Sequence, residues 1–188
     1  MSAYKPLFEK EVLVNAALWV ASRLPGDRCR AHRIFKILWF ADLSHLKRYG
    51  RTITGDTYVA MDDGPVPSVL HDEMKVNPGP NDAFRLFDKD GVEGFVEPLK
   101  VANGDYLSES DVCALQESLD LYGACSLDEL KGLSRKHAWK SAHDAGPNTS
   151  IRMGEMLDEI GADAELRECA MDDIRFRQAW ENFCSCQL

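Results

Sequence analysis

The sequence predicts a mainly α-helical domain of the α+β class, with a small antiparallel sheet made of hairpins. Apolar residues recur at helical spacing along several segments that end at glycine. Two Ser-x-x-Asp/Glu patterns mark helix starts. Two short runs of strand-forming residues flank turn sequences, as hairpins do. With 188 residues, the chain is expected to form a single domain over residues 1–188.

The first two helices are predicted from apolar spacing and from their ends. Val12, Ala16 and Trp19 share one face of a helix over 8–24, and Pro25-Gly26 ends it. Asp27 is a suitable cap for the next helix, which is long and central. That helix is expected to end at Tyr49, because Gly50 follows at the position where helices often take a left-handed residue.

Two hairpins are expected after the central helix. A strand is predicted within 53–61, followed by a turn at Gly64-Pro65. Pro67 then suits the first turn of a short helix that runs to Lys75. Residues 77–81 are proline- and glycine-rich and predict a loop. A second hairpin is expected over 84–97, turning at Asp90-Gly91.

The C-terminal half is expected to be helical. Ser108 with Asp111, and Ser126 with Glu129, form capping boxes that open two helices. The first of these helices is expected to end at Gly123, and Gly146-Pro147 makes a later break. Two more helices are predicted, over 151–160 and over 164–183.

Two polar residues interrupt the apolar face of the central helix. Asp42 and His45 are three residues apart, so their side chains can meet. One interpretation is a structural pair, in which the carboxylate orients the imidazole inside the core. Another is an acid/base pair or half of a metal site, with His137 completing a set of ligands. The structural interpretation is favoured, so no metal or cofactor is expected.

The overall composition narrows the function classes. The formal net charge is −9, which makes nucleic-acid binding unlikely for the protein alone and fits a basic protein partner. No apolar stretch is long enough for a membrane span. The six cysteines form no CxxC pair, which favours a reduced, cytoplasmic protein. No catalytic motif of a common enzyme class occurs, so no enzymatic activity is expected. The oligomeric state is left open.

A long ordered set of motifs starts in the central helix and continues through the first hairpin. It resembles the signature of the Panacea domain, the SocA-like antitoxin family. The residues that carry the resemblance are Lys36, Trp39-Phe40-Ala41-Asp42, Leu46, Tyr49-Gly50, Ile53-Thr54-Gly55-Asp56, Tyr58, Ala60 and Gly64-Pro65-Val66-Pro67. A second element, Leu133 to Trp139 with His137 inside it, is similar to another family motif. The resemblance extends over about 8–161 and leaves 162–188 as a C-terminal helix or tail.

The resemblance implies an antitoxin of a toxin–antitoxin module, which neutralises a cognate toxin by direct protein–protein binding. It also implies a narrower possibility, an adaptor that delivers the toxin to a ClpXP-type protease. Two alternatives of other classes stay open: a metal-dependent hydrolase using Asp42, His45 and His137, and a phage-associated protein that binds a host factor. The partner is expected to dock on the first hairpin and its turn. The candidate contact residues are Thr54, Asp56, Tyr58, Gly64, Pro65, Val66 and Pro67, with Trp139 as a further possible anchor.

Overall fold

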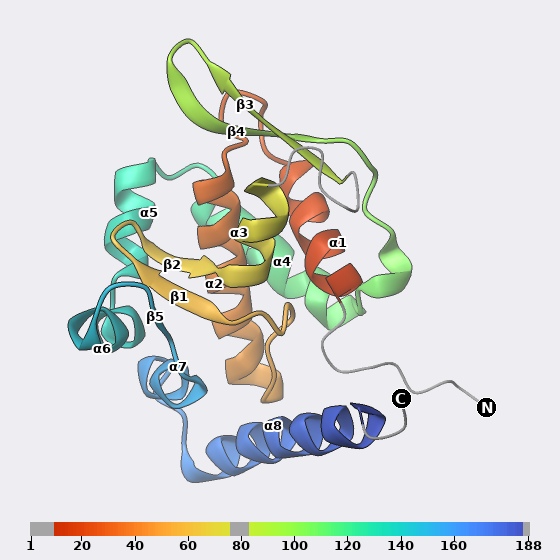
Figure 1. Cartoon of the computed structure of the whole chain (residues 1–188), viewed down its shortest axis with the longest axis vertical. Coiled ribbons are helices and arrows are strands. Elements are labelled where there is room, and N and C mark those ends of the chain that lie inside the picture. Colours follow the sequence, from red (N-terminus) through yellow and green to blue (C-terminus); the bar gives the residue numbers. More distant parts are fainter. Residues whose placement is uncertain (1–9, 76–82, 186–188) are drawn as a thin grey trace.

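The central element of the fold is helix α2 (Ala31–Tyr49). The computed structural model describes residues 10–75 and 83–185. Within them α2 packs against α1 (Lys10–Ala21), α4 (Glu109–Tyr122) and α5 (Leu127–Ser134) (Figure 1). Thirteen of its nineteen residues are buried, because its apolar stripe is wide enough to meet helices on several sides.

The two ends of α2 differ from each other. Gly50 lies in the left-handed region at φ 70°, and its N–H donates to the Leu46 carbonyl, which confirms the expected stop. The expected N-terminal cap is wrong. The helix begins at Ala31 after Arg30, and no side chain caps it. Asp27 lies too far upstream to reach the first free N–H groups of the helix.

The first hairpin consists of β1 (Tyr58–Met61) and β2 (Gly64–Pro67), paired antiparallel with Ala60 opposite Pro65. The two-residue strand β5 (Thr149–Ser150) adds to the other side of β1, so the order is β2-β1-β5. Gly64-Pro65 was expected to be a turn, and this is wrong: the turn is at Asp62-Asp63. Helix α3 (Ser68–Lys75) follows directly.

The second hairpin confirms its prediction. Strands β3 (Phe84–Lys89) and β4 (Val92–Pro98) pair antiparallel and project at one end of the molecule (Figure 1). The Val96 N–H donates to the Cys29 carbonyl at 2.8 Å, so β4 is attached to the segment that leads into α2. The loop expected at 77–81 lies outside the described residues.

The C-terminal half is helical, as expected. A 3-10 turn η1 (Gly104–Tyr106) precedes α4, and both predicted capping boxes are present. Helix α6 (His137–Ala145) is separate from α5, and α7 (Met153–Glu159) follows β5. Helix α8 (Ala164–Ser185) crosses the end of the molecule near α7 (Figure 1). Among its described side chains, only Ala170 is buried.

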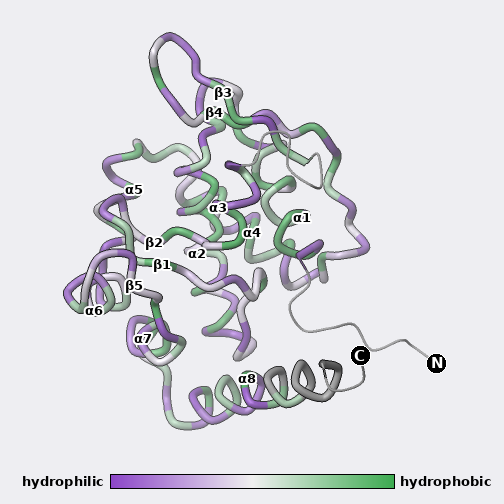
Figure 2. The backbone as a smooth tube through the Cα atoms, viewed as in Figure 1, coloured by the Kyte–Doolittle hydropathy of each residue, from purple (hydrophilic) through white to green (hydrophobic). Residues whose placement is uncertain are grey.

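The core has two parts on either side of the hairpin β1–β2. One lies between α1, α3, α4 and the first half of α2, and Figure 2 shows apolar residues concentrated along α1 and α2. The other, around Trp39 and Tyr58, packs beneath α6 and α7. Within the described ranges, no helix has both the length and the apolar character needed to cross a membrane.

Candidate functional site

Asp42 connects α2 to the segment that leads into β1. Its side chain is fully buried. One carboxylate oxygen accepts hydrogen bonds from the Ile53 and Thr54 N–H groups at 2.7 and 3.1 Å, and the other accepts from the Thr54 hydroxyl at 2.5 Å and the Tyr58 hydroxyl at 2.8 Å. Four donors from neutral groups therefore replace the water that the carboxylate loses on folding.

The burial of Asp42 away from water shifts the pKa of its carboxyl group. Burial raises the pKa of the Asp42 carboxyl to about 6, while the hydrogen bonds from Thr54, Tyr58 and Ile53 act in the opposite direction. The same burial raises the pKa of Tyr58 well above its ordinary value. The phenol therefore stays protonated and donates to the carboxylate. This arrangement fixes the fold around the hairpin and leaves Asp42 no access to a substrate.

His45 has partners of its own, so the expected pairing with Asp42 is wrong. Its Nδ1 lies 2.9 Å from the Arg51 carbonyl, and its Nε2 lies 3.1 Å from Ser110 Oγ and 3.2 Å from the Asp111 carboxylate. Burial lowers the pKa of His45, against the Arg51 carbonyl and Asp111, which raise it. Asp42 and His45 thus face different segments, although they are one helical turn apart. The ring of Tyr49, 52% exposed, tilts against His45 at a centroid distance of 4.5 Å.

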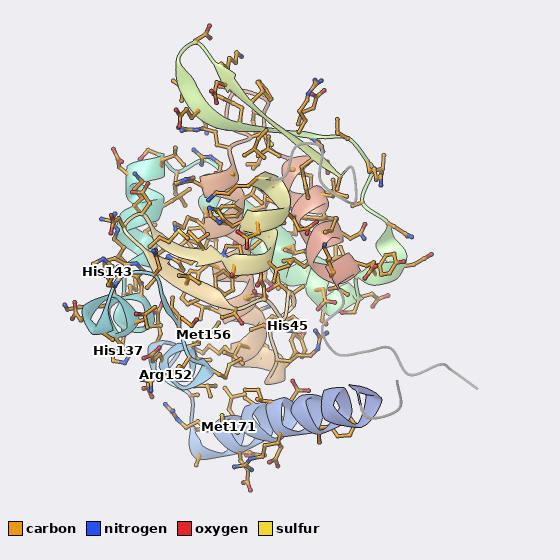
Figure 3. All side chains as sticks on the ribbon, in the orientation of Figure 1. His45, His137, His143, Arg152, Met156 and Met171 are labelled. Carbon is orange, nitrogen blue, oxygen red and sulfur yellow. The ribbon has the colours of Figure 1, made fainter. Side chains whose placement is uncertain are left out.

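The third residue of the hydrolase alternative lies elsewhere. His137 is at the start of α6, 60% exposed, with its Nε2 at 3.7 Å from Asp158. Figure 3 shows His45 near the C-terminal end of α2 and His137 on α6, well apart. Among residues 10–75 and 83–185, no group of three His, Cys, Asp or Glu side chains is placed to hold a metal ion. Asp42, His45 and His137 therefore do not form the proposed metal site.

The expected contact residues of the first hairpin are buried. Tyr58 is 1% exposed, Thr54 2% and Val66 3%. Gly64, Pro65 and Pro67 are buried with them. Asp56 accepts hydrogen bonds from the Val69 and Leu70 N–H groups at the start of α3, and so caps that helix. The expectation that these residues touch a partner is therefore corrected, because side chains enclosed in this way cannot reach another protein.

The two motif-bearing segments meet beside the buried Lys36. Its Nζ donates to the Pro65 carbonyl at 2.7 Å, and burial lowers the pKa of this amine to about 7. Gly64 has φ 99°, and a Cβ built there would lie 2.7 Å from Ser134 Oγ and 2.9 Å from Lys36 Nζ. Lys36, Gly64 and Ser134 therefore fit together only because position 64 has no side chain.

Above this junction the chain exposes a mixed polar and aromatic surface, which we call the hairpin-tip surface. It comes from the β1–β2 turn, α5, the residues after α5, and α6. Arg135 donates to the Asp62 carbonyl, and the Trp139 indole N–H donates to the Met61 carbonyl at 2.8 Å. The members of the surface are Asp62, Asp63, Lys131, Arg135, Trp139 and His143.

Several side chains of the hairpin-tip surface are exposed and can form further hydrogen bonds or ion pairs with another protein. The Asp62 side chain is fully exposed, and its ionic partner within the described ranges is His143 at 3.5 Å. Asp63 pairs with Lys131 at 2.8 Å, and this hydrogen bond lowers the pKa of the Asp63 carboxyl. The Trp139 ring stacks on His143 at 4.4 Å. Carboxylates, a guanidinium and a tryptophan on one surface are suited to binding another protein.

Of this surface, only Trp139 was named as a contact residue from the sequence, although the expected docking segment, 54–67, includes the Asp62-Asp63 turn. A pattern that could have found more was present: Lys131, Arg135, Trp139 and His143 repeat every four residues. This spacing places long side chains in one row on a helical surface. The pattern was hidden because α5 ends at Ser134 and α6 starts at His137, so the row crosses a break between helices. Asp62 and Asp63 join this surface only because the fold brings α5 and α6 beside the β1–β2 turn, and no pattern in the neighbouring sequence indicates this.

A family model described as "Antitoxin SocA-like, Panacea domain" matches residues 34–140, which is more than half of the chain. The match begins within α2 and ends within α6, so it spans both hairpins and the hairpin-tip turn. It is shorter than the resemblance over 8–161 that the motifs indicate. No curated protein and no solved structure matches the chain.

Proposed function

Because the chain belongs to the antitoxin SocA-like Panacea domain family, we propose that it neutralises a cognate toxin by binding it directly, through a face that includes the hairpin-tip surface. The family gives the chain a general antitoxin-like role. The binding mode and the binding face are the proposal. The proposal rests on one observation: the two segments that carry the family motifs meet at Lys36, Gly64 and Ser134, beneath the hairpin-tip surface.

The side chains of the patch are those expected at a protein interface. Tryptophan and arginine dominate the binding energy of many interfaces, and Trp139 and Arg135 lie together, with the guanidinium carbon 5.4 Å from the ring centroid. Both also contact the backbone of the β1–β2 turn, so they are held in position before a partner arrives. Such preorganisation reduces the entropy lost on binding.

Charge supports a basic toxin surface. The net charge of −9 favours encounter with a positively charged partner. The exposed Asp62 carboxylate supplies a negative group at the tip, with the His143 imidazole beside it at 3.5 Å. We further propose that the protein acts by binding alone, without catalysis, and in the cytoplasm, where thiols such as that of Cys29 stay reduced.

The test is co-expression with the product of the adjacent open reading frame. We expect the pair to co-purify and toxicity to disappear. Asp62→Arg should weaken the complex at least about tenfold, since it reverses a charge at the interface, and should leave the melting temperature unchanged. Glu168→Arg on α8 is the matched control, because it makes the same charge change at an exposed position.

Three other outcomes are informative. Rescue without a complex, with a covalent change on the toxin, would overturn the binding proposal. Loss of the toxin from cells, dependent on a ClpXP-type protease, would favour delivery for degradation over simple sequestration. Equal loss of affinity in Asp62→Arg and Glu168→Arg would remove the hairpin tip from the interface while leaving the antitoxin role intact.

A further inference from the structure

A groove of about 630 Å³ opens between the β3–β4 hairpin, the start of α2 and the end of α3. None of its lining residues was singled out by the motifs, and none takes part in the hydrogen bonds around Asp42. Its apolar part is made by Phe35 and Met74 from the body of the domain and by Leu86 and Phe87 from β3. The groove therefore lies between two walls, one formed by α2 and α3 and the other by the β3–β4 hairpin.

Rings lie on both sides of the groove, although Phe35 itself is buried and the more exposed rings beside it are those of His32 and His71. Phe35 lies between two imidazoles, with His32 at a centroid distance of 6.3 Å and His71 at 6.0 Å. On the hairpin, Phe87 stacks on Phe95 at 5.7 Å and is itself 38% exposed. Aromatic faces and edges of this kind prefer another ring as a neighbour, in stacked or edge-on contact.

The charges around the groove balance. Arg30 and Lys75 are matched by Asp88 and Glu93. Partial burial lowers the pKa of His32 and of His71, although Asp63 and Asp72 raise it, so both imidazoles are uncharged near neutral pH. A lining without net charge favours an occupant that is also uncharged, because a charged group would lose its hydration without gaining a counter-ion.

One buried donor in this lining lacks an acceptor. Arg30 donates through Nη2 to the Glu93 carbonyl at 2.9 Å, and its guanidinium lies 5.7 Å from the centre of the Phe95 ring. Its Nε atom is buried and has no hydrogen-bond partner within the described parts of the chain. An unpaired buried donor costs free energy until an acceptor reaches it. Because Nε is enclosed, the Arg30 side chain has to shift toward the groove before an oxygen of an occupant can accept from it, and that contact would remove this cost.

The groove is continuous with the hairpin-tip surface. His32 lines the groove, and its Nδ1 lies 3.4 Å from the Asp63 carboxylate at the hairpin tip. A partner bound over Asp62 and Asp63 can therefore extend a side chain into the groove without leaving the protein surface.

We propose that this groove is a specificity pocket for a tyrosine side chain of the toxin. A tyrosine supplies the three properties that the lining selects: an aromatic ring, no charge, and an oxygen able to accept from Arg30. Phenylalanine lacks the oxygen, and the carboxylates lack the ring. This inference deepens the proposed function and rests on it for the source of the tyrosine, whereas the chemistry of the pocket does not depend on that source.

The pocket can be tested without the toxin. The probe is p-cresol, which has the tyrosine side chain, compared with toluene, which lacks the hydroxyl. In two-dimensional NMR of the full chain, p-cresol should shift the His32 and His71 ring signals saturably. Toluene should bind about fivefold more weakly, since it makes no hydrogen bond to Arg30.

Two variants of the β3–β4 hairpin test whether the p-cresol shifts arise from binding in the groove. Phe87→Asp should abolish the p-cresol shifts, because it puts a charge on the groove wall. Val92→Asp is the control, since Val92 is 41% exposed on the same hairpin and does not line the groove. No shifts at either histidine, or the same binding in both variants, would overturn the pocket. Equal affinity for p-cresol and toluene would overturn the role of the oxygen.

Toxin binding then separates the two proposals. If the toxin binds and Phe87→Asp leaves its affinity unchanged, the tyrosine pocket is wrong and the antitoxin proposal stands. If p-cresol binds as expected and no toxin complex forms, the pocket stands and the proposed function is wrong. If both hold, replacing the anchoring tyrosine of the toxin by alanine should weaken the complex to the same extent as Phe87→Asp.

Discussion

The two hairpins have the same antiparallel pairing and opposite surroundings. In β1–β2, every residue of β2 is buried, and Tyr58 and Ala60 of β1 face the core. In β3–β4, most side chains near the turn are exposed, and only Phe84, Phe95 and Val96 are buried. The first hairpin is thus part of the interior of the domain, whereas the second is attached to it at one end.

The difference shows what the family motifs encode. The motif residues of the longer element lie in α2, in the segment before β1 and in the buried hairpin, and their hydrogen bonds and packing join these three parts. The exposed hairpin carries none of the quoted motifs and offers free aromatic surface beside a groove. The motifs therefore describe mainly a scaffold, and of the proposed contacts Asp62, Trp139 and Phe87 only Trp139 belongs to a motif.

Removing the carboxylate under the first hairpin should have the largest effect. Asp42→Ala leaves four donors without their acceptor, and we expect the free energy of unfolding to fall by ~2–4 kcal/mol in urea denaturation. The control is Asp63→Ala at the hairpin tip. Its carboxylate is 37% exposed and its ion pair should contribute ~0–1 kcal/mol. Equal losses in the two variants would contradict an interior role for Asp42.

One glycine from each hairpin, Gly64 in β2 and Gly91 in the β3–β4 turn, gives a matched pair. Both Gly64, at φ 99°, and Gly91, at φ 76°, have left-handed backbone, but a Cβ at Gly91 meets nothing within 4 Å. Gly91→Ala should cost ~1 kcal/mol for conformation alone. Gly64→Ala should cost ~2–4 kcal/mol, because the methyl group also collides with Ser134 and Lys36. Equal costs would show that the β1–β2 junction is less tightly packed than the distances indicate.

The lowered pKa of Lys36, which lies beside the buried hairpin, predicts that the stability of the protein depends on pH. The unfolded chain keeps this proton up to ~10.4, whereas the folded protein loses it near 7. Between these values the unfolded state binds more protons, so stability rises with pH. From pH 7 to about 8.5 the contribution should be on the order of 1 kcal/mol. Lys36→Met should abolish this rise, and a rise that persists in the variant would assign it to other groups.

The exposed hairpin should tolerate change with little loss of stability. Phe87→Ala removes the stacking on Phe95 and should cost ~1 kcal/mol or less. The same variant should weaken toxin binding by more than this, because Phe87 forms a wall of the proposed pocket. A calorimetric titration and a denaturation curve on the same sample compare the two. A fall in stability larger than that of Asp42→Ala would reverse the contrast between the hairpins.

Local signals in the sequence were enough to predict most helices and the second hairpin, but not β5 or the separate helix α6. Helical spacing located α2, Gly50 located its end, and the capping boxes of Ser108 and Ser126 located two more helix starts. The strand β2 was missed because prolines normally argue against strands. Here Pro65 and Pro67 are tolerated because β2 is at the edge of the sheet, where a missing N–H breaks no ladder.

The site could be predicted only in part, because it depends on contacts between distant residues. The helical wheel placed Asp42 and His45 on one face correctly, but their partners come from segments up to 66 residues away, such as Asp111. Tyr58 was expected on the surface because aromatic residues are common at interfaces. It is buried because its hydroxyl has an acceptor in Asp42 and its ring packs edge-on against Trp39 at 4.8 Å.

Hydrogen exchange of the protein, alone and with the product of the adjacent open reading frame as the proposed toxin, tests whether the partner docks on the hairpin tip and the groove. We expect the proposed toxin to slow amide exchange at Asp62 and Asp63, over 135–143 and over 86–94. Exchange within 58–60 should not change, because these residues are already enclosed. Slowed exchange confined to α8 or to the outer face of α4, with none at the hairpin tip or the groove, would contradict docking on these two surfaces.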